Sequence, residues 1–418
     1  MPTQGFDYRG GRYYCEQVDL ARVAEQCGTP CYVYSASSIA ENYRAYNDAL
    51  GAIPHEIHYA VKANSSIGLL ALLAREGAGF DIVSGGELFR VLKAGGDPAK
   101  VVFSGVGKSA EEIRYALDSG IGWFNCESEA ELELLNQIAG ELGVRPNVAL
   151  RVNPDIDADT HPYIATGLHA HKFGVELCEA ERIYAAAAGM ANVDPNGVSC
   201  HIGSQIFDTG AFYEALDKVV ELAERLRGRG LPIRNLDLGG GLAVAYRNGE
   251  ATPSIRGYAS RLAEALEGRH LKLMLEPGRS IVGQAGVLLT TVLYRKRTGA
   301  KEFVIVDAAM NDLIRPALYQ AHHEIVPLHR REASMIEADV VGPVCESGDF
   351  LARGRRMPDC VPGEILAVCT VGAYGFVQSS NYNSRPRPPE VLVEGGSFKV
   401  IRNRETRDDL IRGETANP

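Results

Sequence analysis

Short apolar runs recur over much of the chain and alternate with longer amphipathic segments. The runs predict eight strands, at residues 57–61, 79–83, 101–104, 122–125, 147–152, 198–202, 235–238 and 272–275. Helices are predicted between most of them, including residues 111–118, 127–142, 211–227 and 255–267. Strands that alternate with helices form a parallel sheet, and a count of eight favours a closed (β/α)8 barrel of the TIM type over an open doubly wound sheet.

The pattern changes after residue 283, where β-rich segments follow one another without long helices. Strands are predicted at 287–294 and 302–307, with a turn at 296–299 between them. Strands at 391–393 and 398–401 flank Glu394-Gly395-Gly396-Ser397, which is a hairpin signal. We therefore expect a C-terminal antiparallel β-sandwich or β-barrel domain, with a frayed tail after about Arg404.

The N-terminal segment predicts a short helix at 18–26, a strand at 31–34 and a further helix to about residue 50. A chain of 418 residues is longer than a single core usually supports, so two domains are expected. The predicted barrel domain covers residues 28–280. The predicted β domain combines residues 1–27 with residues 281–418.

Composition narrows the choice of partners and compartment. A formal net charge of -10 argues against a nucleic-acid groove or an anionic membrane surface as the main partner. No run approaches the ~18 apolar residues of a membrane span, and the polar N-terminus holds no signal-peptide core. The nine cysteines form no CxxC pair, which favours reduced thiols in the cytoplasm over disulfides or a zinc site.

No metal site is expected from the remaining histidines and acids. The pairs His169/His171 and His322/His323 lack other ligands at suitable spacing. Residues 155, 157 and 159 are aspartates spaced as in a calcium loop, but the glycine and glutamate of such a loop are missing. A solvated turn that includes His161 is the simpler expectation.

Several residues that are costly to bury, or that contribute nothing to packing, stand at the ends of the predicted barrel strands. Barrel enzymes place their reactive groups at these ends. They are Lys62, Asp81, Arg151, His201, Gly239, Gly240, Gly241 and Glu276. Each has an ordinary explanation as well: a rim lysine, a helix-capping acid, an arginine paired on the rim, or a core histidine. Together they predict a site.

Gly239-Gly240-Gly241 follows the seventh predicted strand, a position at which barrels often bind phosphate. Residues without Cβ let backbone N–H groups approach an anion, although a tight turn without a ligand is the alternative. A lysine and a phosphate loop in one barrel mouth suggest pyridoxal 5'-phosphate, with Lys62 forming the Schiff base. Glu276 can then hydrogen-bond the pyridine nitrogen, and His201 can pack against the ring.

Five blocks in order carry a resemblance to a known family. They are Tyr59-Ala60-Val61-Lys62-Ala63-Asn64, His201-Ile202-Gly203-Ser204-Gln205, Gly239-Gly240-Gly241, Glu276-Pro277-Gly278-Arg279-Ser280 and Cys345-Glu346-Ser347-Gly348-Asp349. With these blocks the chain resembles the alanine-racemase-like, fold type III pyridoxal-phosphate decarboxylases, and among them the diaminopimelate decarboxylase family. The resemblance covers nearly the whole length.

The resemblance implies a role for each site residue. Lys62, His201 and Glu276 would serve the cofactor as described above, and Asp81 and Arg151 match supporting positions. The phosphate would be bound by Ser204, Gly239, Gly240, Gly241 and Tyr374, with contacts from Gly278 and Arg279. Cys345 would donate the proton that replaces carbon dioxide, and its loop would reach the partner's site in a homodimer with shared active sites.

Diaminopimelate carries an amine and a carboxylate at its far end, so its pocket needs an acid and cations together. Glu346 is the candidate acid, and the candidate donors are Arg279, Arg315, Tyr319 and Tyr374. Without the motifs, Arg315 and Tyr319 would be an ordinary surface pair at i, i+4. The resemblance implies conversion of meso-2,6-diaminopimelate to L-lysine and carbon dioxide, the last step of lysine biosynthesis.

Three alternatives use similar scaffolds. A decarboxylase of ornithine, lysine or arginine is the nearest, and Arg315 argues against it because a cation repels the distal amine of such substrates. A racemase is expected to place an arginine where Glu276 stands. A non-catalytic homologue would have no need of both Lys62 and Cys345.

Overall fold

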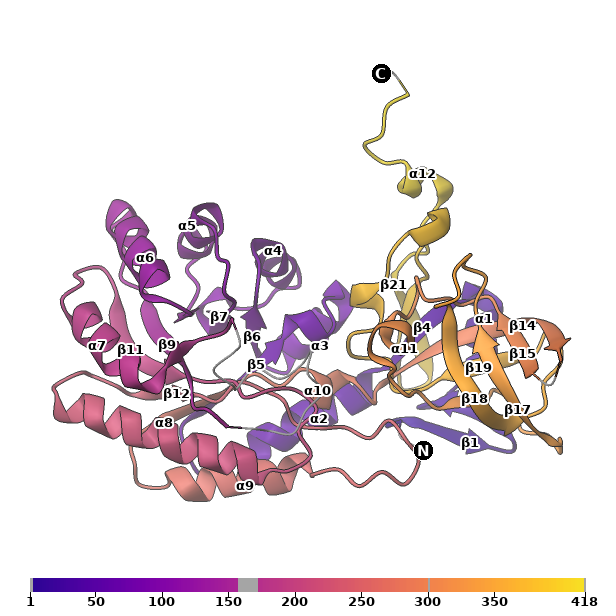
Figure 1. Ribbon diagram of the computed structural model, residues 1–418, viewed down its shortest axis with the longest axis horizontal. Coiled ribbons are helices and arrows are strands. Elements are labelled where there is room, and N and C mark those ends of the chain that lie inside the picture. Colours follow the sequence, from indigo (N-terminus) through magenta and orange to yellow (C-terminus); the bar gives the residue numbers. More distant parts are fainter. Residues whose placement is uncertain (1–2, 157–171, 300, 417–418) are drawn as a thin grey trace. The chain divides into compact units, whose positions relative to one another are not determined.

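The computed structural model describes residues 3–156, 172–299 and 301–416, and the chain forms two compact units (Figure 1). The barrel unit consists of Ala40–Val244 and Thr252–Ile281. The β unit consists of Met1–Ile39, Ala245–Ala251 and Val282–Pro418. The sequence predicted a barrel domain of residues 28–280 and a β domain of residues 1–27 and 281–418. These domain ranges remain predictions.

The barrel unit is built on eight parallel strands that close on themselves, because β13 pairs with β5 and β8 pairs with β9. The predicted (β/α)8 barrel is therefore confirmed. The strands are β5 (His55–Ala60), β6 (Gly79–Ile82), β7 (Val101–Phe103), β8 (Trp123–Cys126), β9 (Asn147–Asn153), β11 (Asp194–Ser199), β12 (Asn235–Asp237) and β13 (Lys272–Leu275). The short β10 (Val175–Glu176) pairs with β9 outside this ring.

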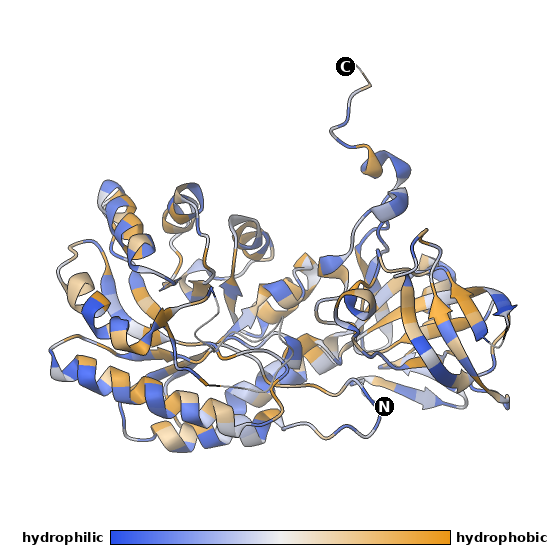
Figure 2. Ribbon diagram, viewed as in Figure 1, coloured by the Kyte–Doolittle hydropathy of each residue, from blue (hydrophilic) through white to orange (hydrophobic). Residues whose placement is uncertain are grey.

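Amphipathic helices cover the barrel, and their alternating apolar and polar stripes are visible in Figure 2. They are α2 (Ala36–Ala49), α3 (Ile67–Arg75), α4 (Gly85–Lys93), α5 (Ala110–Asp118), α6 (Glu129–Leu142), α7 (Leu177–Ala188), α8 (Gly210–Gly228), α9 (Ile255–Leu266) and the short α10 (Arg279–Val282). The 3-10 turn η1 (Val61–Ala63) follows β5, and the 3-10 turn η2 (Pro98–Lys100) precedes β7. Serine side chains cap several helices; at α5, Ser109 and Glu112 form a capping box.

The β unit combines the N-terminal segment with the C-terminal part of the chain. β1 (Phe6–Arg9), β2 (Arg12–Cys15) and β3 (Val18–Asp19) form a three-stranded sheet that precedes α1 (Leu20–Cys27). The main sheet contains β4 (Cys31–Ser35), β14 (Gly286–Thr298), β15 (Lys301–Val306), β16 (Ile325–Pro327), β17 (Met335–Val341), β18 (Phe350–Pro358), β19 (Ile365–Val368), β20 (Glu390–Glu394) and β21 (Ser397–Arg402). Its pairings are antiparallel except β15 with β17 and β4 with β20.

Short helical turns complete the β unit: α11 (Arg315–Tyr319), η3 (Phe376–Gln378), η4 (Tyr382–Ser384) and α12 (Arg407–Leu410). A buried cluster that includes Tyr13, Val33, Val287 and Val391 joins segments from both ends of the chain. None of the described helices has the length and hydrophobicity of a membrane span.

Three details of the predicted β domain are wrong. β14 continues through the predicted turn at 296–299 as far as Thr298, and the reversal comes at Gly299, whose φ of 60° suits a residue without Cβ. The tail after Arg404 is not frayed at once, because the side chain of Thr406 caps α12. The strands β1 to β3 and β16 to β19 were not predicted.

Candidate active site

Lys62 lies in the turn that follows β5, and its amine contacts an acid of the next strand. Nζ of Lys62 is 2.5 Å from Oδ2 of Asp81, which is fully buried in β6. Oδ1 of Asp81 is buried and has no hydrogen-bond partner among the residues that the structure describes. Nearby, burial and then the charge of Asp81 raise the pKa of Glu87 in α4 to about 7. The site therefore holds acid groups beyond the one that pairs with Lys62.

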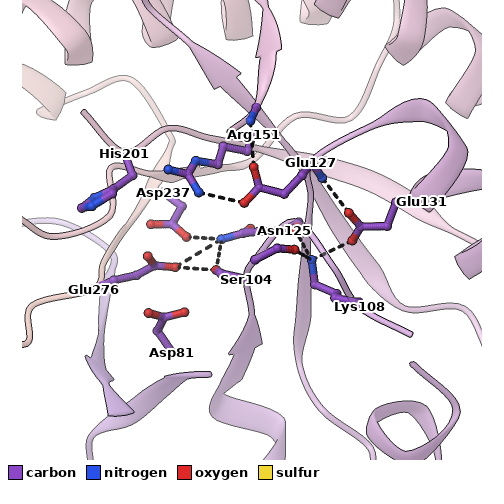
Figure 3. Close-up of polar contacts among 12 residues, drawn as sticks. Asp81, Ser104, Lys108, Asn125, Glu127, Glu131, Arg151, His201, Asp237 and Glu276 are labelled. Atoms are coloured by element: carbon purple, nitrogen blue, oxygen red, sulfur yellow. Dashed lines mark hydrogen bonds and ion pairs between the residues drawn. The ribbon is translucent and has the colours of Figure 1, made fainter. Parts of the chain in front are cut away.

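Glu276 follows β13 and is buried among polar groups from β12, β8 and the end of β7 (Figure 3). Ser104 Oγ donates to Glu276 Oε1 over 3.1 Å, and Asn125 Nδ2 lies 3.2 Å from the same oxygen. The same Asn125 nitrogen donates to Asp237 Oδ2 over 2.7 Å. One amide therefore joins two carboxyl groups inside the barrel.

Both carboxyl groups resist ionisation. Burial, followed by the charges of Asp237 and Asp81, holds the pKa of Glu276 well above its usual range. Burial also raises the pKa of Asp237, against the hydrogen bond that its Oδ1 accepts from the backbone N–H of Gly239 over 2.9 Å. Desolvation of two neighbouring acids is the common cause.

Arg151 lies near the end of β9 and is held by a buried ion pair. Its Nη1 lies 2.7 Å from Oε1 of Glu127, and Glu127 Oε2 accepts the backbone N–H of Gly174 over 2.8 Å. The Arg151 guanidinium lies 4.7 Å from the ring centroid of Phe173. Nη2 of Arg151 is buried without a hydrogen-bond partner among the described residues. The arginine thus keeps one donor available in the barrel.

His201 is partly buried two residues after β11, and its ring is neutral. Burial, followed by the positive charges of Arg151 and Lys62, lowers the pKa of His201 well below its usual range. The backbone N–H of Gly240 lies 3.2 Å from Nδ1, which makes this nitrogen the acceptor. A Cβ at Gly239 would come within 2.5 Å of Nδ1, so the ring and the glycine loop are closely packed.

The glycine loop packs against the turns that carry the other site residues. A Cβ at Gly240 would lie 2.3 Å from the carbonyl oxygen of Glu276, and one at Gly241 would lie 2.3 Å from that of Gly203. Gly239 and Gly241 also have φ of 64° and 118°, which favour glycine. At this mouth Arg279 Nη2 donates to Ser204 Oγ over 3.0 Å. Backbone N–H groups and hydroxyls are thereby gathered in one place.

Gly278 ties the loop of Glu276 to the turn of Lys62. A Cβ at Gly278 would lie 2.8 Å from Cβ of Ala63, and the backbone N–H of Ala60 donates to the carbonyl oxygen of Pro277 over 3.1 Å. The structure therefore places these predicted residues in one barrel mouth: Lys62, Asp81, Arg151, His201, Ser204, Gly239, Gly240, Gly241, Glu276, Gly278 and Arg279.

The β unit carries the other predicted residues. Arg315 is buried at the start of α11, and its guanidinium lies 5.2 Å from the ring centroid of Tyr246 and 5.9 Å from that of Tyr319. Arg315 and Tyr319 thus lie on one helical turn, and because Arg315 is buried they are not an ordinary surface pair. Nε of Arg315 donates to Nε2 of His323 over 3.4 Å, while His323 Nδ1 contacts the carbonyl oxygen of Cys369 at 2.8 Å. Burial, then the charge of Arg315, lowers the pKa of His323 to about 3.

Cys345 is exposed in a loop after β17, whereas free cysteines are usually buried packing residues. Its backbone N–H donates to Oδ1 of Asn383 over 2.8 Å. Asp349 closes the loop by accepting the N–H of Val344 at Oδ2 and that of Met310 at Oδ1, both over 2.7 Å. Next to Cys345, Glu346 lines an open hollow of about 420 Å³. An exposed thiol and an acid are therefore presented on one closed loop.

Tyr374 lies between β19 and η3 with a φ of 56°, a conformation that a residue with a side chain rarely adopts. Phe376, two residues on, is buried against the edge of Tyr32 at a centroid separation of 5.8 Å. The guanidinium of Arg402 lies 4.5 Å from the Phe376 centroid. This packing fixes the segment in which Tyr374 is held.

Five residues that the site uses were not predicted as site residues: Ser104, Asn125, Glu127, Asp237 and His323. Ser104, Asn125 and Asp237 stand at or next to strand ends, so the rule that selected Lys62 and Glu276 would also have selected them. His323 was considered only as a metal ligand. Within 3–156, 172–299 and 301–416 no cluster of His, Cys, Asp or Glu could hold a metal ion. Residues 157, 159, 161, 169 and 171 lie outside those ranges.

A family model described as the pyridoxal binding domain of pyridoxal-dependent decarboxylases matches residues 36–283. The chain belongs to this class of enzymes. It is 55% identical over 413 residues to the diaminopimelate decarboxylase of Pseudomonas aeruginosa, with 99% of each chain covered.

Solved structures agree with that relationship. The diaminopimelate decarboxylase of Helicobacter pylori, complexed with L-lysine, is 44% identical, with a TM-score of 0.91 and coverage of 94% of this chain and 98% of that one. The diaminopimelate decarboxylase of M. jannaschii is 36% identical, with a TM-score of 0.94 and coverage of 100% and 99%. Within its class, the chain belongs to the diaminopimelate decarboxylase family.

The barrel mouth fits the pyridoxal 5'-phosphate of this class. A Cβ at any of three successive positions of the glycine loop would clash with its neighbours, so only glycines let this backbone lie so close to the other site residues, as a loop that holds a phosphate requires. A lysine, a neutral imidazole and a buried acid stand beside it. Arg151 Nη2 and Asp81 Oδ1 are buried polar atoms without partners among the described residues, as expected where a polar group binds.

Proposed function

We propose that this protein removes carbon dioxide from meso-2,6-diaminopimelate to give L-lysine, the last step of lysine biosynthesis, in the cytoplasm. The observation that carries the proposal is the placement of Lys62, His201, Glu276 and the glycine loop in one barrel mouth. When bound there, pyridoxal phosphate supplies an acceptor for the electron pair that remains as the carboxylate leaves.

Residues of the barrel hold and orient the reacting groups. The amine of Lys62 would hold the cofactor by its aldehyde group, and Asp81 fixes the position of this amine. Ser204 and the glycine loop of Gly239, Gly240 and Gly241 would hold the phosphate, with contacts from Gly278, Arg279 and Tyr374. His201 packs against the ring face, which suits its neutral imidazole, and Arg151 supports it.

Glu276 is proposed to hydrogen-bond the ring nitrogen. A proton held between this nitrogen and the carboxyl oxygen increases the electron demand of the ring, which favours loss of carbon dioxide over racemisation. The burial of Glu276 supports this role because an exposed carboxylate would be bound by water instead.

Recognition of the far end of the substrate is proposed for Arg315, Tyr319, Glu346, Arg279 and Tyr374. A planar guanidinium grips a carboxylate at two points, and Tyr246 and Tyr319 leave Arg315 little freedom to turn. Glu346 offers an acid for the distal amine. A buried arginine would repel the positively charged far end of ornithine, lysine or arginine. A decarboxylase of those substrates is therefore not expected to place an arginine there.

Cys345 is proposed to deliver a proton to the carbon that has lost its carboxylate. A thiol is acidic enough to give up this proton near neutral pH, and the exposed position of Cys345 gives it access. We further propose a homodimer in which the loop of Cys345 and Glu346 serves the active site of the partner subunit.

A complementation experiment tests the shared site. Lys62→Ala is expected to be inactive and Cys345→Ala to be slower by about a hundredfold or more. An equal mixture that exchanges subunits should recover about a quarter of the wild-type activity, because half of the dimers then contain one intact site. A mixture that exchanges subunits and remains inactive would contradict sharing.

The reaction itself is tested with a substrate panel. Carbon dioxide release by the cofactor-loaded protein is measured with meso-2,6-diaminopimelate, ornithine, lysine and arginine at equal concentration. We expect turnover of diaminopimelate alone. Preference for any of the other three substrates would refute the proposed specificity while leaving decarboxylation intact.

A further inference from the structure

Asp237 and Glu276 are two carboxylic acids on neighbouring strands, and one side chain bridges them. Asp237 ends β12, Glu276 follows β13, and Asn125 reaches both from β8 (Figure 3). Asn125 Nδ2 is 2.7 Å from Asp237 Oδ2 and 3.2 Å from Glu276 Oε1. Two acids that share one donor inside a closed barrel lie close enough for each to feel the charge of the other.

The charged and titratable groups that face this pair come from five parts of the barrel. They are His58 of β5, Lys62 of η1, Asp81 of β6, Arg151 of β9 and the Cys200 thiol after β11.

The two cations among these groups, Lys62 and Arg151, are paired with other acids. Lys62 lies 2.5 Å from Asp81, and Arg151 lies 2.7 Å from Glu127. His58 Nε2 lies 3.4 Å from Glu56. Two negative charges on the pair would thus lack a dedicated counter-charge, and repulsion in a buried site favours retention of one proton.

We propose that Asp237 and Glu276 share one proton in the cofactor-free protein, and that Asp237 is a positioning residue that keeps this proton at Glu276. Ser104 and Asn125 occupy Oε1 of Glu276, and Asn125 and the Gly239 N–H occupy the two oxygens of Asp237. Oε2 of Glu276 is the oxygen that none of these donors contacts. The inference rests on the proposed role of Glu276 at the ring nitrogen.

This arrangement supplies the proton that the ring nitrogen needs. When the cofactor binds, the O–H bond of the pair breaks and an N–H bond forms, so the pair carries two negative charges and the ring gains one positive charge. No proton is taken from solvent, and the new cation offsets the repulsion within the pair. The high pKa of both acids in the cofactor-free protein agrees with a proton stored at this point.

The proton can be observed directly by infrared spectroscopy of the full-length protein without cofactor at pH 8.5. A protonated carboxyl group absorbs apart from carboxylates, and its band shifts in deuterated water. We expect one such band per subunit, its loss on loading with pyridoxal phosphate, and its loss without cofactor in both Asp237→Asn and Glu276→Gln. Glu87→Gln and Asp312→Asn are the controls, because these acids have pKa values of about 7 and should leave the band unchanged.

Each other outcome overturns the inference. A wild-type protein without the band, or with a band that survives loading, shows that the pair does not give up a proton. A band that persists in Asp237→Asn shows that Asp237 is not needed to hold it. The wild-type measurement does not depend on the folding of any variant, and it separates this inference from the substrate panel, since the stored proton is read without turnover.

Discussion

Lys62 and Asp81 form an ion pair in which the acid is fully buried and the lysine side chain is 36% exposed. Because Asp81 stands on the strand next to the one that Lys62 follows, the barrel itself sets the position of the amine. The ion pair fixes the position of the Lys62 amine, and the partial exposure of the lysine side chain leaves it accessible to a reactant.

Asp81→Asn keeps the shape of the side chain and removes the charge that orients Lys62. We expect turnover to fall by about tenfold or more, since a misplaced reacting group loses most of the benefit of proximity. Covalent attachment of the cofactor, followed by its visible absorbance during reconstitution, should slow as well. Asp118→Asn changes an exposed acid at the end of α5 and should match the wild type. Equal reconstitution rates in both variants would remove Asp81 from the mechanism.

Lys62→Ala should abolish decarboxylation, because Lys62 is the amine that the structure places beside Asp81 in the barrel mouth. Treatment with borohydride, which fixes a cofactor bonded to an amine, should label the wild type and leave Lys62→Ala unlabelled. Lys399→Ala changes an exposed lysine of β21 and should be labelled as the wild type is. Turnover that survives in Lys62→Ala would refute the proposed function.

Cys345→Ala should slow the reaction by about a hundredfold or more, the usual contribution of a positioned proton donor. Cofactor binding should be unchanged, because Cys345 stands in the β unit on its own loop. Cys178→Ala removes the other exposed cysteine, in α7, and serves as the matched control. If both variants turn over at the wild-type rate, the proton comes from another group.

Arg315→Met removes the charge proposed to bind the far carboxylate and keeps an unbranched side chain. KM for diaminopimelate should rise by about tenfold or more, the loss of a charged hydrogen bond. The ratio of activities should move toward ornithine, since the repelling cation is gone. Arg407→Met changes an exposed arginine of α12 and should alter neither quantity. An unchanged KM would place the far carboxylate elsewhere.

His323 makes stability depend on pH, and the sign follows from its depressed pKa. The unfolded chain binds a proton at this histidine below its ordinary pKa of about 6.5, whereas the folded protein binds it only near 3. Stability is therefore full above 6.5 and falls by up to about 1.4 kcal/mol per pH unit between 6.5 and 3. His323→Gln should flatten the dependence of Tm on pH over that range relative to the wild type. Parallel curves for the two proteins would contradict a neutral, buried His323.

The barrel could be predicted from the sequence because each of its strands produces its own local pattern of apolar residues. Strands buried on both faces read as apolar runs, and β5 to β13 follow them closely apart from β11, which begins at Asp194 rather than at residue 198. The strands β16 to β19 were missed where charged residues interrupt the pattern, as Glu337 and Asp339 do in β17. Their partners are also distant in the sequence, so no local signal reveals them.

Site residues could be predicted where the type and position of a single residue indicate its chemistry. Lys62, His201 and Glu276 stand out because each is costly at a buried strand end. Asn125 and Asp237 also stand at or next to strand ends, but the hydrogen bond between them spans 112 positions of the chain, and no local pattern reveals it. His323 was set aside for want of metal ligands, whereas its observed partner is an arginine. Roles in catalysis and binding stay predictions.

Asp349 accepts the backbone N–H of Met310, which leads to α11, and that of Val344, which leads to Cys345. One carboxylate thus clasps the segment proposed to choose the substrate to the segment proposed to finish the reaction. With the roles proposed for these segments, a change at Asp349 would alter both of them at once. The proposed roles therefore make this single side chain a link between substrate selectivity and reaction rate in this protein.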